Sequence, residues 1–112
     1  MPEEIYSTGT WRPSPGKEEA FVEAWAEFAA WASGRPGAGT LRLTRDTRGG
    51  GYLSFGRWSS VEAVRAWKSA PDFRERLAQV LQHVDDFEPT ELEVVATAES
   101  GAAAAHLVRA GP

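Results

Sequence analysis

The chain lacks cysteine altogether and has only two histidines among its 112 residues. Without thiols there can be no disulfide, no thiolate metal site and no cysteine nucleophile. Long apolar runs are missing too, since no stretch approaches the roughly 20 residues of a membrane-spanning helix. The N-terminal Met-Pro-Glu-Glu is acidic, where a secretory signal carries positive charge. We therefore expect a soluble cytoplasmic protein with no membrane partner.

Positive charge is also in short supply, because the formal net charge is −4. The stretch from Arg35 to Arg76 does hold nine basic and four acidic residues, but a nucleic-acid binder would usually be basic overall, so we expect no nucleic-acid partner. The two histidines lie far apart, with no ligand spacing around them, so no metal site is predicted. The triglycine at 49–51 joins two strands rather than opening a helix, which argues against a phosphate-binding loop.

Hydrophobic periodicity predicts a mixture of strands and helices. Apolar residues at helical spacing, beginning with Phe21, Trp25 and Phe28, mark the most regular helix. Alternation of apolar and polar residues, as in Leu41 and Leu43, marks the strands. The expected helices are 17–33, 61–67 and 73–84, and the expected strands are 5–12, 40–47, 52–58 and 91–97.

This order, β-α-β-β-α-β, is that of a split β-α-β unit with a four-stranded antiparallel sheet, and it predicts an α+β domain over residues 1–97. Residues 98–112 have little to bury and are expected to form a tail. Helices on one face of the sheet leave the other face apolar at Leu53 and Phe55. A second copy of the chain is the simplest cover, so a homodimer is expected.

Several segments, in their order and spacing, resemble antibiotic-biosynthesis monooxygenase domains over about residues 5–97. They are Phe21 and Trp25 in the first helix, Pro36-Gly37 in the loop, the segment from Trp58 to Trp67, and Pro71-Asp72-Phe73. The resemblance implies a ferredoxin-like, dimeric α+β barrel. Two sheets would face each other, with one pocket per subunit between the helices and the sheet.

Members of that family oxidise polyketide phenols to quinones without metal or flavin, so the resemblance implies a cofactor-independent monooxygenase acting on a small aromatic molecule and O2. Three positions are functional in its aromatic-polyketide branch: an asparagine, a tryptophan four residues later and a tyrosine six beyond that. This chain has Ser54, Trp58 and Val64 there. Ser54 keeps a hydrogen-bonding group, whereas Val64 has none.

We expect an aromatic pocket in which Ser54 orients a substrate oxygen, and the catalytic candidates are Ser54, Trp58 and His83. For Trp25 and Trp58, ordinary core packing is an equally good interpretation. His83 near a helix end is also explained as a solvated cap. The predicted substrate-binding residues are Trp25, Phe28, Ser54, Trp58, Trp67, Phe73 and Leu77.

Other functions remain open at this stage. Loss of the polar trio favours a non-catalytic domain that binds a small ligand or merely dimerises. The haem-degrading branch would place Gly9, Trp67 and Leu77 at its functional positions, and leucine cannot ligate iron. Cyclase or isomerase chemistry would need an acid or base, for which His83 and Arg42 are the candidates.

Overall fold

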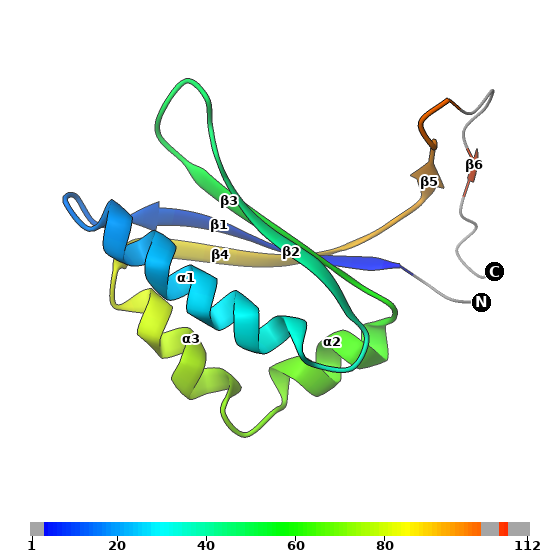
Figure 1. Ribbon diagram of the computed structural model, residues 1–112, viewed down its shortest axis with the longest axis horizontal. Coiled ribbons are helices and arrows are strands. Elements are labelled where there is room, and N and C mark those ends of the chain that lie inside the picture. Colours follow the sequence, from blue (N-terminus) through cyan, green and yellow to red (C-terminus); the bar gives the residue numbers. More distant parts are fainter. Residues whose placement is uncertain (1–3, 102–105, 108–112) are drawn as a thin grey trace.

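The computed structural model of the chain describes residues 4–101 and the backbone of residues 106 and 107. Its main body consists of four strands and three helices (Figure 1). In chain order these are β1 (Ile5–Pro13), α1 (Glu18–Ser33), β2 (Ala38–Arg45), β3 (Tyr52–Trp58), α2 (Val61–Lys68), α3 (Phe73–Leu81) and β4 (Val84–Glu93).

The four strands form one antiparallel sheet in the order β2-β3-β1-β4. All three helices cover the same face of this sheet, so the molecule has two layers (Figure 1). The order of elements and the antiparallel four-stranded sheet confirm the ferredoxin-like α+β fold predicted from the sequence. The core lies between the layers, and its largest fully buried side chains are Trp58, Phe21, Val64 and Val80.

The last long strand differs from the prediction. We expected a break around Asp85-Asp86 and Pro89 and a strand only from Glu91, whereas β4 already begins at Val84. β4 is an edge strand that pairs only with β1 within the described sheet. An edge strand tolerates a proline, because its missing N–H need not serve a second neighbour. Asp85 and Asp86 are exposed to solvent, so their charges do not disturb the core.

Local signals account for the helix boundaries. Ser60 caps α2, because its hydroxyl accepts a hydrogen bond from the backbone N–H of Ala63 at 3.0 Å. The loop before β2 approaches this helix closely at Gly37, which has a φ of +86°. A Cβ on Gly37 would lie 2.5 Å from that of Ala63. Only glycine suits both the backbone conformation and the contact.

The helix-facing side of the sheet has large side chains at its ends and small ones at its centre. Two neighbouring cross-strand pairs between β1 and β3 are small, Ser7 with Gly56 and Gly9 with Ser54. The pairs flanking them are large, Ile5 with Trp58 and Trp11 with Tyr52. Because residues two apart on a strand share a face, this alternation leaves a hollow in the middle of the sheet.

Beyond β4 the chain continues into β5 (Ala96–Thr97), which pairs with β6 (His106–Leu107) in a second, two-stranded sheet. This small sheet lies beyond the end of the main sheet and away from the helices (Figure 1). Much of the predicted tail, residues 102–105 and 108–112, falls outside the described part. Among the described helices, none is both long and apolar enough to cross a membrane.

Candidate functional site

A cavity of about 210 Å³ lies over the hollow, between the sheet and the helices. Its volume exceeds the roughly 150 Å³ of an apolar cavity that holds benzene. It falls below the roughly 300 Å³ at which sites for drug-sized ligands begin. One or two aromatic rings therefore suit it. The lining comprises Ser7, Thr8, Gly9, Trp11, Trp25, Phe28, Leu41, Ser54, Phe55, Gly56, Trp67, Lys68, Phe73, Leu77, Phe87 and Pro89.

The floor of the cavity depends on its two glycines. A Cβ on Gly9 would lie 2.8 Å from Cε1 of Phe87 and 2.9 Å from Nε1 of Trp11. On Gly56 it would lie 2.6 Å from Cγ of Leu41. All three distances are shorter than a side-chain contact allows, so the two glycines let neighbouring side chains lean over the sheet. The floor is consequently shaped by backbone as well as by side chains.

Aromatic rings form the walls, and they support one another. Trp11 stacks on Phe87 with ring centroids 4.0 Å apart. Trp67 meets Phe73 edge to face at 5.1 Å, and Phe28 packs on Phe73 at 5.9 Å. Such ring pairs add about 0.5–1.5 kcal/mol each beyond their buried area. The walls are thus held in place before any ligand binds.

Two serines at the floor each accept a hydrogen bond from an indole. Nε1 of Trp11 donates to Oγ of Ser54 at 2.9 Å, and Nε1 of Trp58 donates to Oγ of Ser7 at 3.1 Å. The hydroxyl of Ser54 in turn donates a long hydrogen bond, 3.5 Å, to the carbonyl oxygen of Gly9. Ser7 donates to no other described residue. The hydroxyl proton of Ser7 is therefore free for a ligand, and that of Ser54 makes only a long bond that a ligand oxygen can replace.

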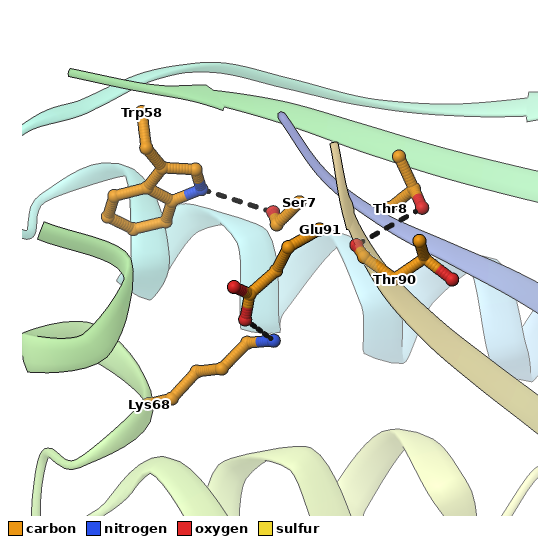
Figure 2. A network of polar contacts seen from close by, with 6 residues as sticks. All are labelled: Ser7, Thr8, Trp58, Lys68, Thr90 and Glu91. Carbon is orange, nitrogen blue, oxygen red and sulfur yellow. Dashed lines mark hydrogen bonds and ion pairs between the residues drawn. The ribbon is translucent and has the colours of Figure 1, made fainter. Parts of the chain in front are cut away.

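Lys68, the last residue of α2, gives the cavity lining a positive charge. Nζ of Lys68 lies 2.8 Å from Oε2 of Glu91 on β4, and the two side chains are 31% and 43% exposed. Figure 2 shows this ion pair beside the hydrogen bond from Trp58 to Ser7. The neighbouring Trp67 is 6% exposed, yet its Nε1 has no hydrogen-bond partner among the described residues. A buried donor without a partner is costly unless something binds to it.

Six of the seven residues predicted to bind substrate line the cavity, and one does not. Trp58 is fully buried behind the wall, stacked on Trp67 with centroids 4.5 Å apart. It therefore supports Trp67 and holds Ser7 instead of facing the cavity. The six lining residues are Trp25, Phe28, Ser54, Trp67, Phe73 and Leu77.

The remaining candidates lie elsewhere. His83 lines a separate groove between α1 and α3, and Arg42 is exposed on β2 and contributes to a groove beside α1. Val64, at the position of the family's tyrosine, is fully buried in the core. Within the described residues, no group of three or more histidine, aspartate or glutamate side chains is placed to hold a metal ion.

The other ten lining residues were not predicted to bind substrate, and those among them that give the cavity its polar groups and one aromatic wall are Ser7, Trp11, Lys68 and Phe87. Ser7, Gly9 and Trp11 share one face of a strand, and this run of two small residues followed by a large one was the available signal. Phe87 was missed because β4 was expected to start after it. Lys68 had no signal beyond following Trp67 in the chain.

Comparison with known proteins agrees with this architecture. The family model for antibiotic biosynthesis monooxygenases matches residues 5–79. No curated protein sequence gives a significant match.

Solved structures of three other proteins illustrate the likeness. SnoaB, a cofactor-independent oxygenase from Streptomyces nogalater, is 19% identical with a TM-score of 0.72, over 80% of this chain and 91% of SnoaB. Rv0793 from Mycobacterium tuberculosis is 19% identical with a TM-score of 0.69, over 80% and 92% of the two chains. A conserved protein from Methanosarcina mazei is 11% identical with a TM-score of 0.72, over 80% and 91%.

At these identities the structural likenesses establish the fold, whereas the family model covers well over half of the sequence. The ferredoxin-like sheet, the cavity above its small central residues and the matched segment agree with one another. The chain belongs to the antibiotic biosynthesis monooxygenase family.

Proposed function

We propose that the protein is a cofactor-independent monooxygenase acting on a small oxygenated aromatic molecule. Family membership supports a monooxygenase-type activity, and the cavity of about 210 Å³ with its aromatic walls carries the proposal. Its size favours one or two rings over three. Ser54 would orient a substrate oxygen, because its hydroxyl donates only a long hydrogen bond to Gly9 while Trp11 fixes its oxygen.

The proposed reaction requires few catalytic groups from the protein. A phenol or its keto tautomer ionises, passes one electron to O2, and the resulting radicals combine into a hydroperoxide. Loss of water then gives the quinone, so one oxygen atom of O2 enters the product and the other leaves as water. Donors at the cavity surface favour the ionised substrate by hydrogen bonding, and the aromatic walls limit the contact of the intermediates with water.

Oxygen consumption tests this proposal. With 1-naphthol as a two-ring substrate, we expect catalysed uptake of one O2 per molecule and formation of 1,4-naphthoquinone carrying one ¹⁸O atom from ¹⁸O2. Anthrone, with three rings, should react more slowly. Uptake no faster than without protein, across a panel of naphthols, hydroquinones and anthrones, would contradict the proposal. Retention of an aromatic ligand without turnover would then indicate a binding domain.

A second candidate function is non-catalytic ligand binding, and the composition of the cavity lining supports it. Lys68 is the only ionisable side chain that lines the cavity among the described residues. His83 and Arg42, the acid–base candidates for cyclase or isomerase chemistry, lie outside it. The oxygenase reaction is compatible with this composition, since the substrate supplies the electron itself.

We also propose that two copies pair through the uncovered face of the sheet. Leu53 and Leu92 on that face are 45% and 50% exposed, and Tyr6 and Phe55 lie there with ring centroids 6.3 Å apart. An apolar sheet face is unfavourable in water, and a second copy would cover it. The arrangement would leave the cavity of each subunit on the far side of its own sheet.

Sedimentation velocity tests the pairing. The unmodified protein should sediment as a dimer, and Leu53→Glu should shift it to a monomer, because burying an unpaired carboxylate in an apolar interface costs several kcal/mol. Leu81→Glu is the matched control, since Leu81 on α3 is 37% exposed and faces away from the sheet interface. A monomeric unmodified protein, or a dimer that survives Leu53→Glu, would contradict the pairing.

A further inference from the structure

The polar groups that the cavity offers to a ligand are nearly all donors. These are the free hydroxyl proton of Ser7, the hydroxyl of Ser54 with its long bond to Gly9, and the ammonium of Lys68. Carboxylates are absent from the described lining. A donor-rich site is complementary to a ligand with electron-rich oxygen atoms and is a poor match for one that itself donates.

Two of these donors, Ser7 and Lys68, belong to one connected cluster. Trp58 donates to Ser7 and stacks on Trp67, and Lys68 follows Trp67 at the end of α2. On the other side, Ser7 pairs across the strands with Glu91, the partner of Lys68. The cavity therefore has a polar end, formed by Ser7 and Lys68, opposite walls that are aromatic.

The ion pair at this end is suited to exchange its partner. Both side chains are partly exposed, and such pairs contribute only about 0–1 kcal/mol to stability. Lys68 is half-buried at the cavity lining, so an anionic oxygen inside the cavity would meet its ammonium in a less aqueous setting than Glu91 does. A charge-assisted hydrogen bond is stronger where water is excluded.

We propose that the ligand is an aromatic molecule carrying an anionic oxygen group, a carboxylate or a phenolate, and that Lys68 leaves Glu91 to bind this group. The hydroxyl of Ser7 supplies a further hydrogen bond to it. The inference rests on the proposed function in taking the cavity as the substrate site, and it adds the charge of the substrate and the residue that selects it.

Equilibrium dialysis with 2-naphthoate and its neutral analogue 2-naphthamide tests the charge selection. The unmodified protein should bind 2-naphthoate about tenfold more tightly, as expected for one charge-assisted hydrogen bond. Lys68→Met keeps the stem of the side chain but should abolish the preference. Glu91→Gln removes the competing carboxylate and should tighten binding of 2-naphthoate several-fold.

The chain offers a matched control, because it has only two lysines. Lys17 is exposed just before α1, and Lys17→Met should leave the preference unchanged. A second readout needs no variant: with ¹³C-methylated lysines, 2-naphthoate should shift the NMR signal of Lys68 and leave that of Lys17 in place.

Equal binding of the two probes, binding of neither, a preference that survives Lys68→Met, or an unmoved Lys68 signal would each overturn the inference. These outcomes are separable from failure of the oxygenase proposal. Charge-selective binding without oxygen uptake would leave the inference standing and remove the catalytic function. Oxygen uptake with 1-naphthol but without charge selection would do the reverse.

Discussion

Leu77→Trp is expected to reduce catalysed oxygen uptake by about 100-fold or more while the protein stays folded. Leu77 projects from α3 into the cavity lining and is partly buried. An indole there would occupy much of the 210 Å³ and displace the substrate ring from Ser54. Misplacing a substrate by about 1 Å can already cost about 100-fold in rate. The measurement is the oxygen-electrode assay with 1-naphthol, paired with a thermal unfolding curve.

The same substitution one turn further along the helix provides the control. Leu81 is 37% exposed and does not line the cavity, so Leu81→Trp should retain nearly all oxygen uptake. Extra atoms at Leu77 enter existing space, and the free energy of unfolding should therefore fall by less than the roughly 1–3 kcal/mol typical of an overpacked core. Full activity in a folded Leu77→Trp protein would show that the reaction takes place elsewhere.

Trp58→Ala is expected to lower the free energy of unfolding by about 3–5 kcal/mol, as large truncations of buried aromatic residues do. Trp58 is fully buried, stacks on Trp67 and donates to Ser7, so its loss opens a void behind the wall. For a domain of this size that change lowers Tm by roughly 10 °C or more. Chemical denaturation and calorimetry measure the effect.

Trp58→Phe separates packing from hydrogen bonding at this position. It keeps a ring against Trp67 but removes the N–H that fixes Ser7. The free energy of unfolding should therefore fall by only about 1–2 kcal/mol more than it does for a conservative core substitution. Binding of 2-naphthoate should weaken modestly because Ser7 is no longer held. A Trp58→Ala protein with unchanged stability but no activity would place Trp58 in contact with substrate and contradict its position behind the wall.

Much of the fold could be predicted because local pattern and tertiary contacts agree. The helical spacing of Phe21, Trp25 and Phe28 corresponds to buried positions on α1. The start of β4 could not be predicted, since Asp85, Asp86 and Pro89 are strand breakers by composition, and only the edge position of the strand makes them acceptable.

The candidate site was predictable in kind but not in detail. Aromatic residues on helices that cover a sheet indicate an apolar cavity, and Trp25 and Phe28 do line one. Whether a tryptophan faces the cavity or stands behind it depends on which side chain stacks over it, and for Trp58 that is Trp67. The part played by Lys68 depends on Glu91, 23 residues away in the chain, and no local pattern connects them.

A crystal structure of the protein with 2-naphthoate would show directly whether the cavity is the ligand site and whether Lys68 binds the anionic group. We expect the ring system in the cavity between the sheet and α3, its carboxylate on Nζ of Lys68, and the side chain of Glu91 released. A ligand bound on the outer sheet face or in the groove beside His83, with the cavity unoccupied and the Lys68–Glu91 ion pair intact, would contradict this expectation.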